Sequence, residues 1–336
     1  HARNASATRP VRWTLAEAHA NLGHRNPTDI LTMSRRGLLP HVTLITTSMP
    51  PCVACLQGVA DFHTAADRIG HRATRPLERL FLDFFIAGGE VGYDDVNVVL
   101  YVLDDATRYL WVHAAPTRTE CVTWFLDNIP RFERHARASI CDIVSDNGPE
   151  FLSHHFRNAL MTRGIEHIFS VAHEQVHNGA IERTIKTITQ MARRTLAAAA
   201  LPARFWPFAI RHCVFLLNRL PHAALDRRFS PYAALYNRHP RYHHLVPFGV
   251  LVYYKVLPTP SKVAARHASL GIFLGFHPNV DALLVWDPIH DRTVFALSVR
   301  ILAGRTFANF TASLPGTGVL SDDAAIPLLL DTSSEP

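Results

Sequence analysis

The feature that most constrains the fold of this chain is the eight-residue run 96–103, in which Asn97 is the only polar residue. A strand with one face in water alternates between apolar and polar residues, whereas a nearly continuous apolar run is typical of a central strand that is covered on both faces. The sequence therefore predicts a sheet with helices packed against both of its sides.

Apolar runs on either side of this segment predict the rest of an α/β unit. We expect further strands at 80–86, 108–114, 140–144 and 166–170, and helices at 119–134, 151–163 and 181–200. Pro130 is expected to kink or shorten the first of these helices, because proline lacks the amide hydrogen that a helix interior requires. The predicted order of elements is β-β-β-α-β-α-β-α.

Three acidic residues are placed where this order would bring them together. Asp83 interrupts the apolar strand 80–86, Asp146 directly follows the strand 140–144, and Glu182 opens the helix 181–200, with 35 residues between the last two. An ionised carboxylate in an apolar strand is costly without a partner, and a divalent cation is its natural partner. Three such carboxylates could hold two Mg²⁺ ions about 3.5–4 Å apart, the arrangement used for in-line phosphoryl transfer.

Other acids near the strand ends compete for this role. Asp104 and Asp105 are better explained as turn residues between two strands, because aspartate stabilises turns. Asp142 lies in the predicted strand itself, and Glu150 is expected to belong to the loop of Asp146 without binding metal.

A second group of candidate ligands lies near the amino terminus. His19 and His24 are followed, after 27 residues, by Cys52 and Cys55. Two closely spaced pairs of imidazole and thiol ligands match the tetrahedral preference of Zn²⁺. The alternative is that these are two surface histidines, in a chain with 21 of them, and two core cysteines. We favour zinc, and because the segment holds few apolar residues, the metal would supply much of its folding free energy.

The other cysteines do not suggest disulfides. The chain has five cysteines, and an odd number argues against a disulfide framework. Cys121, Cys141 and Cys213 stand alone in apolar contexts and are expected to be small core residues.

Charge is unevenly distributed along the chain. The net charge is +5 over residues 1–80, −4 over 81–200 and +9 over 201–320. An acidic centre between basic flanks suits a protein that gathers metal ions and holds a polyanion, although a basic solvated surface would give the same totals. Lys186 and Arg193 share a helix face with Glu182, so they could meet phosphates, or Lys186 could simply pair with Glu182 at i, i+4.

The carboxy-terminal third has the pattern of a small barrel. Short strands are expected at 250–256, 272–276, 283–287 and 294–301. Lys255, Lys262 and Arg266 are the candidates for contacts with a nucleic-acid backbone. Residues 309–336 lack periodicity and are expected to be disordered. No apolar run reaches the roughly 18 residues of a membrane span, so we expect no membrane partner.

The residues around the three acids resemble those of the integrases of Ty1/copia-type retrotransposons, within the retroviral-integrase (DDE) superfamily. The matching segments are Arg75-Pro76-Leu77-Glu78, Ser145-Asp146-Asn147-Gly148, Asn178-Gly179 and Glu182-Arg183. Further matches follow in order at 205–206, 217–219, 230–232 and 273–276, so the resemblance covers roughly residues 15–308. One segment departs from it: 172–177 reads Ala-His-Glu-Gln-Val-His where the family has a Pro-Gln-rich stretch, which puts the DNA contacts of this loop in question.

The resemblance implies a specific architecture. An HHCC zinc-binding helical domain (15–60) and a linker (61–76) would precede a ribonuclease H-like catalytic core (77–225), a mixed five-stranded sheet with helices. A connector (226–244), an SH3-like β-barrel (245–308) and an acidic tail (309–336) would follow. The chain, which begins with a histidine, would be a piece of a longer polyprotein.

The resemblance also implies a function. Asp83, Asp146 and Glu182 would bind two Mg²⁺ or Mn²⁺ ions and join the 3′-hydroxyl ends of double-stranded element DNA to target DNA, with 3′-end nuclease activity as a further expectation. One Zn²⁺ would occupy the amino-terminal site. The protein would self-associate and act in the nucleus, arriving from cytoplasmic virus-like particles. Two alternatives remain: a catalytically silent or domesticated nucleic-acid-binding fragment, and a ribonuclease H, which would not need the flanking domains.

Overall fold

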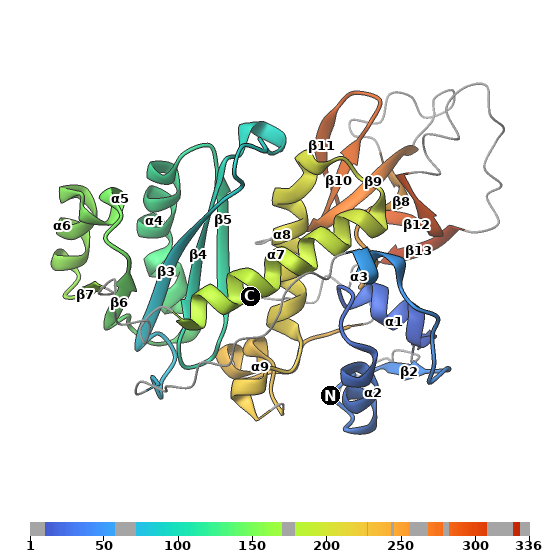
Figure 1. Ribbon diagram of the computed structural model, residues 1–336, viewed down its shortest axis with the longest axis horizontal. Coiled ribbons are helices and arrows are strands. Elements are labelled where there is room, and N and C mark those ends of the chain that lie inside the picture. The colour runs from blue at the N-terminus through green and yellow to red at the C-terminus, as the bar shows by residue number, and fades with distance from the viewer. Residues whose placement is uncertain are drawn as a thin grey trace, which may run out of the picture. The chain divides into compact units, whose positions relative to one another are not determined.

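The computed structural model describes residues 11–57, 72–169, 179–226, 228–242, 245–255, 268–277, 282–307 and 325–329 (Figure 1). The chain divides into two compact units. One unit consists mainly of residues 58–196 and 202–240, and the other contains the amino-terminal segment to residue 57, residues 197–201 and the segment from 241.

The first unit is built on a mixed five-stranded sheet. Its strands are β3 (Arg79–Ile86), β4 (Val98–Asp104), β5 (Leu110–Ala115), β6 (Asp142–Ser145) and β7 (Glu166–Phe169). They lie in the order β5-β4-β3-β6-β7. The β3, β4 and β5 strands pair antiparallel, while β6 runs parallel to β3 and β7 parallel to β6. The α/β class and the mixed five-stranded sheet are therefore confirmed, and the arrangement is consistent with a ribonuclease H-like core.

Most of the apolar run 96–103 lies in β4, the second strand in the order of this sheet. Every residue of β4 is buried, as expected for a strand covered on both faces. On one face, Leu80, Leu82 and Leu100 pack into a core with Phe125 and Phe156. These two rings belong to the helices α4 (Arg118–Ala136) and α6 (His154–Thr162).

The opposite face of the sheet is covered by other helices. Phe85 of β3 packs at 5.9 Å, ring to ring, against Trp206, the first residue of α8 (Trp206–Arg219). Because successive side chains of a strand point to opposite faces, Asp83 shares this face with Phe85 and not the face of Leu82. Asp83 is thus kept out of the apolar core beneath α4.

Two helix predictions need correction. α4 continues for six residues past Pro130, so the proline does not shorten it; Ile129 and Phe132, on either side of it, are buried and hold the helix to the sheet. The helix expected at 151–163 is two helices, α5 (Pro149–Leu152) and α6, because Ser153 has an extended backbone (φ −62°, ψ 146°). The hydroxyl of Ser153 accepts a hydrogen bond from the Phe156 amide and so begins α6.

The remaining helices of this unit follow the sheet in sequence. They are α7 (Gly179–Ala199), η2 (Ala203–Phe205), α8, η3 (Ala223–Leu225) and α9 (Pro231–Tyr236). The Asn218 side chain on α8 binds both the amide and the carbonyl of Leu110 at 2.9 and 2.8 Å, which ties α8 to β5. α9 falls in the stretch predicted as a connector, and its Tyr236 ring lies 5.6 Å from that of Tyr109.

The amino-terminal segment forms a small module of its own. β1 (Val11–Trp13) pairs in parallel with β2 (Val42–Leu44), and three helices accompany them: α1 (Leu15–Asn21), α2 (Pro27–Arg35) and α3 (Val53–Gln57). Thr14 and Glu17 cap α1 reciprocally, each side chain accepting from the other residue's amide. Leu15, Leu22 and Ile30 are fully buried. The module therefore has more apolar core than the sequence suggested.

The carboxy-terminal segment forms an antiparallel six-stranded sheet. Its strands are β8 (Val250–Lys255), β9 (Ala268–Phe276), β10 (Leu283–Asp287), β11 (Arg292–Ala296), β12 (Ser298–Thr306) and β13 (Ala325–Leu329), in the order β11-β10-β9-β8-β12-β13. In the described residues no pairing joins β11 to β13, so the sheet is open, and the SH3-like barrel stays a prediction.

Two predictions for this segment were wrong in detail. The single strand expected at 294–301 is two strands that meet at Leu297. The segment 309–336, expected to be disordered, contains β13, which pairs with β12 from Ala325 to Leu329. The pairing satisfies the backbone of β12, whose amides and carbonyls on that side would otherwise need other partners. None of the described helices is long and apolar enough to cross a membrane.

Candidate metal centres

The first candidate site is assembled by a sharp reversal of the chain after α1. His19 lies in the last turn of α1, and the helix ends at Leu22, whose amide donates to the Ala18 carbonyl. Gly23 and His24 then both adopt left-handed backbone conformations (φ 67° and 59°), and the His24 amide donates to the His19 carbonyl at 2.7 Å. This conformation suits glycine and is unfavourable for His24. Its effect is to turn the second imidazole back toward the first.

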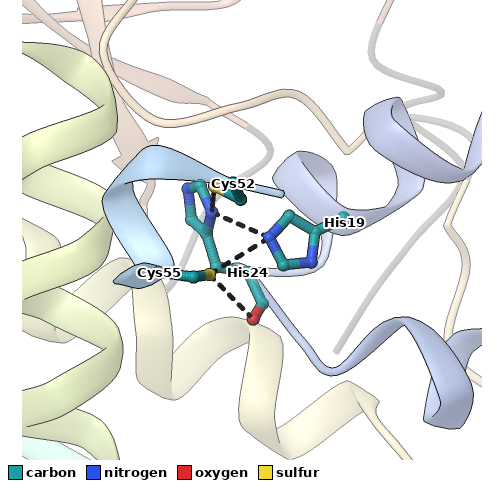
Figure 2. A group of neighbouring side chains, drawn as sticks. All are labelled: His19, His24, Cys52 and Cys55. Carbon is teal, nitrogen blue, oxygen red and sulfur yellow. Dashed lines mark hydrogen bonds between the residues drawn. The ribbon is translucent and has the colours of Figure 1, made fainter. Parts of the chain in front are cut away.

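Cys52 and Cys55 come to the same point from the start of α3 (Figure 2). His24 Nδ1 lies 3.2 Å from His19 Nε2 and 3.3 Å from Cys52 Sγ, and His19 Nε2 lies 3.2 Å from Cys55 Sγ. All four atoms lie within 4.8 Å of one another. Four ligands around a tetrahedral zinc ion would be about 3.3–3.8 Å apart, given Zn–N and Zn–S bonds of about 2.0 and 2.3 Å. The four side chains thus form a His₂Cys₂ site that is compatible with zinc.

The orientation of His19 is fixed by an atom that sequence analysis missed. His19 Nδ1 lies 2.7 Å from the main-chain carbonyl of Arg25, so it carries the hydrogen and donates it. Nε2 is then the nitrogen with the free electron pair, and this nitrogen faces His24 and Cys55. Because the acceptor is a backbone carbonyl, no residue type at position 25 could have indicated this contact.

The second candidate site is centred on Asp83. Asp83 lies in the middle of β3, opposite Tyr101 of β4, and Oδ1 accepts the amide hydrogen of Phe84 at 2.8 Å. The pKa of Asp83 is raised from 3.8 to about 6: burial is the largest cause, the Phe84 hydrogen bond opposes it, and the negative charges of Asp146 and Glu182 add to it. The structure therefore brings both Asp146 and Glu182 within electrostatic reach of Asp83.

Asp146 and Glu182 lie in more open surroundings than Asp83. Asp146 directly follows β6 and is exposed; its Oδ1 accepts the amide hydrogen of Gly148 at 3.1 Å and so closes a tight turn. Glu182 is exposed in the first turn of α7, where the helix dipole favours a negative charge. In the described part of the chain, the His₂Cys₂ group is the only set of three or more potential ligands that lie close together. The three acids are neighbours but not a closed cluster.

The other acids considered as metal ligands make hydrogen bonds or ion pairs within the fold, as the sequence predicted for Asp104 and Asp105. Asp104 accepts hydrogen bonds from the amides of Leu77 and Thr107, both at 2.9 Å. Asp105 pairs with Arg108 at 3.1 Å. Glu150 lies in the loop of Asp146 and pairs with Arg118 at 3.5 Å, a partner that sequence analysis did not find because it lies 32 residues away.

The predicted nucleic-acid contacts are exposed where the structure describes them. Lys186 and Arg193 are exposed on α7, while Ile181 and Ile188 of the same helix are fully buried, as its periodicity predicted. Lys255 is exposed at the end of β8. Lys262 and Arg266 lie outside the described residues, as do 170–178, which contain the unusual segment before Glu182.

The structure places the three acids in β3, directly after β6 and in the first turn of α7, and the residues around them are those that resemble retrotransposon proteins. Comparison with curated proteins confirms that resemblance: the chain is similar to Pol polyproteins of Ty1/copia-type retrotransposons. No family model matches the chain.

Three relatives define the relationship. The chain is 27% identical over 327 residues, 95% of its length, to the retrovirus-related Pol polyprotein from transposon TNT 1-94 of Nicotiana tabacum. It is 30% identical over 212 residues (63% of the chain) to that from transposon RE2 and 28% identical over 243 residues (72%) to that from transposon RE1, both of Arabidopsis thaliana. The matches span 24%, 14% and 16% of these polyproteins, so the chain corresponds to one region of each.

Proposed function

We propose that this chain is the integrase region of a Ty1/copia-type Pol polyprotein and joins the 3′-hydroxyl ends of element DNA to target DNA. The observation that supports the proposal is the position of Asp83, half-buried in the middle of β3, where burial and also the charges of Asp146 and Glu182 raise its pKa. Three acids from a central strand, a strand end and a helix match the ligand set expected of a two-metal phosphoryl-transfer site.

The chemistry of the three acids fits divalent cations. A carboxylate that is desolvated and faces two like charges is destabilised in its ionised form, and a dication would reverse that effect. When bound there, Mg²⁺ or Mn²⁺ would activate a water or a DNA 3′-hydroxyl and stabilise the departing 3′-oxygen. Asp83 would be the fixed ligand, since it lies within the pairing of β3 with β4, and Asp146 and Glu182 would complete the set from a turn and a helix.

The flanking modules are proposed to bind zinc and DNA. The distances in the His₂Cys₂ site support one Zn²⁺ held by His19, His24, Cys52 and Cys55. Lys186 and Arg193 would contact the phosphates of an element end, and the basic carboxy-terminal segment, with Lys255, Lys262 and Arg266, would hold the DNA backbone. We further propose that the protein acts as a multimer on chromosomal DNA in the nucleus, and reaches it from cytoplasmic virus-like particles.

A strand-transfer assay tests the proposal and separates it from its alternatives. The zinc-bound chain is incubated with Mg²⁺ or Mn²⁺, a labelled duplex that carries the element's terminal sequence, and an unlabelled target duplex. We expect labelled ends joined to the target. Cleavage of the RNA strand of an RNA–DNA hybrid without any joining would indicate a ribonuclease H. DNA binding with neither reaction would indicate a silent binding fragment, and either result would overturn the proposal.

A further inference from the structure

Two side chains, Ser145 of β6 and His167 of β7, form a hydrogen-bonded pair, and Ser145 contacts the backbone of Asp146. Ser145 is fully buried, and its Oγ lies 2.9 Å from both the main-chain carbonyl of Asp146 and His167 Nε2. Ser145 shares a face of β6 with Ile143, which packs in the core beneath α4, so Ser145 and Asp146 point to opposite sides of the sheet. The pair therefore contacts Asp146 only through its backbone.

The hydrogen-bond directions in this group are determined by its chemistry. A serine hydroxyl has one hydrogen, and the Asp146 carbonyl can only accept, so Ser145 donates to Asp146 and must accept from His167. His167 therefore carries its hydrogen on Nε2. Its Nδ1 is buried and has no hydrogen-bond partner among the described residues, which a nitrogen with a lone pair tolerates better than an N–H group would.

The surroundings of His167 favour this neutral, fixed ring. Burial lowers the pKa of His167, and the positive charge of Arg157 lowers it further, so the ring is neutral at neutral pH. The ring lies 5.2 Å from that of Phe156 and 4.2 Å from that of Phe169, which leaves it little freedom to rotate.

The contact restrains the part of the chain that presents the Asp146 carboxylate. The Asp146 carbonyl is held by Ser145, and Asp146 Oδ1 is held by the Gly148 amide at 3.1 Å. In the described structure Oδ2 accepts no hydrogen bond and is the oxygen left for a ligand. Because Asp146 is exposed, nothing else packed around its side chain would fix the direction of that oxygen.

We propose that His167, acting through Ser145, is a positioning residue for Asp146: it orients the peptide that follows Asp146 and thereby sets the carboxylate for metal binding. The inference rests on the proposed function, since it assumes that Asp146 is a metal ligand. It predicts that loss of the His167–Ser145 hydrogen bond weakens metal binding without unfolding the sheet, as loss of an outer-shell partner commonly does by about 10–100-fold.

The test uses the full zinc-bound chain and two measurements. Mn²⁺ binding is measured by calorimetry without DNA, and the Mg²⁺ concentration for half-maximal joining is measured with saturating DNA. His167→Leu and Ser145→Ala are each expected to weaken Mn²⁺ binding about 10-fold. Each should raise the Mg²⁺ concentration for half-maximal joining by a similar factor. The double variant should be no worse than either single one, because both remove the same relay. His167→Gln, which keeps an N–H donor at a similar distance, should restore most of the affinity.

Controls separate this inference from the proposed function. His155→Leu removes an exposed histidine of α6 and should change neither measurement. Asp146→Asn should abolish both; wild-type behaviour of that variant would overturn the proposed function itself. If Asp146→Asn is inactive while His167→Leu and Ser145→Ala bind Mn²⁺ like the wild type, the positioning role is wrong and the proposed function stands. If the losses of Mn²⁺ affinity in the two single variants multiplied in the double variant, the two residues would act independently, and the proposed positioning through Ser145 would be wrong. Ser145→Ala removes a single oxygen atom, so it gives the same test if the leucine variant does not fold.

Discussion

The His₂Cys₂ group and the three acids differ in how completely the fold assembles them. The four zinc-type ligands already lie within 4.8 Å of one another, on a helix end and a short helix that are fixed by local hydrogen bonds. The three acids come from elements far apart in the sequence, and only Asp83 is half-buried, while Asp146 and Glu182 are exposed. One site is closed in the fold, and the other is open.

The difference follows from charge. Imidazole rings and thiols can approach closely because their neutral forms do not repel one another, and a hydrogen bond such as that from His19 to the Arg25 carbonyl can orient them in advance. Three carboxylates cannot gather in this way, because each new negative charge raises the energy of the others. The raised pKa of Asp83 is caused mainly by burial, and the charges of Asp146 and Glu182 contribute to it. The three carboxylates are therefore expected to stay apart until a cation binds, whereas the histidines and cysteines of the same chain can gather before zinc binds.

The largest expected effect is on the closed site. Removal of zinc with a strong chelator should unfold residues 11–57 and leave the five-stranded sheet intact, because zinc binding of about 10–16 kcal/mol is coupled to folding in such small modules. Hydrogen exchange followed by mass spectrometry would report both regions at once. Cys55→Ser should have the same effect. Cys141→Ser should have none, because Cys141 lies outside the site and is exposed, contrary to the expectation that it is a core residue. A zinc-free protein that keeps α1 to α3 protected would show that the apolar core of Leu15, Leu22 and Ile30 suffices.

The open site should lose activity without losing structure. Asp83→Asn, Asp146→Asn and Glu182→Gln should each reduce joining by about 10³-fold or more, since each removes a ligand from a two-metal site. Circular dichroism and thermal unfolding should be close to those of the wild type. Glu150→Gln, which affects the partner of Arg118 in the same loop, is the matched control and should keep most of the activity. Wild-type joining by any one of the three acid variants would exclude that residue from the site.

A third prediction uses pH to measure the free-energy cost of ionising Asp83 in the fold. The pKa of Asp83 is 3.8 in an unfolded chain and about 6 in the folded protein, so the folded state holds the proton more tightly. Asp83 therefore costs no stability below pH 4, and the cost grows as the pH rises to 6 and is complete above it. Without added divalent metal, Asp83→Asn should gain about 1–3 kcal/mol over the wild type at pH 8, and less at pH 5. Urea unfolding at both pH values measures the difference, and a gain that does not depend on pH would contradict it.

The smallest expected effect concerns the turn that holds Asp146. A Cβ atom at position 148 would lie 3.0 Å from Asp146 Oδ1, so Gly148→Ala forces that oxygen to shift. The backbone of Gly148 is ordinary (φ −56°), and the fold should not be affected. We expect joining to fall several-fold and higher Mg²⁺ to restore it, because the carboxylate moves but is not lost. Activity equal to that of the wild type would show that the turn tolerates the shift.

Much of the fold and of the two candidate sites could be predicted from the sequence, because local patterns of residues determine them. The apolar run of β4, the single charge in β3 and the paired spacing of His19, His24, Cys52 and Cys55 are local patterns, and the structure places all of them as expected in strands or in one ligand group. The roles of Asp104 and Asp105 in a turn could also be predicted, because aspartate is common in turns.

What could not be predicted depends on contacts between distant residues or on backbone atoms. The Arg25 carbonyl, the Arg118–Glu150 pair and the Ser145–His167 hydrogen bond leave no mark in local sequence. The split at Ser153 resulted from a capping hydroxyl that competes with helix continuation. β13 was missed because its short apolar run lies in an acidic, unpatterned tail, and its partner β12 is what makes it a strand.

The placement of Asp83 and Glu182 has a consequence for how the open site would fluctuate. β3 pairs with β4 from Leu80 to Ile86 and with β6 from Arg79 to Phe81, so the amides that donate within these ladders should exchange with solvent only when the sheet unfolds. The amides around Glu182, in the first turn of α7, should exchange by fraying of that turn, at a much lower free energy. Two ligands of one proposed site would then belong to different cooperative units, and metal binding should slow exchange at the start of α7 while leaving β3 unchanged.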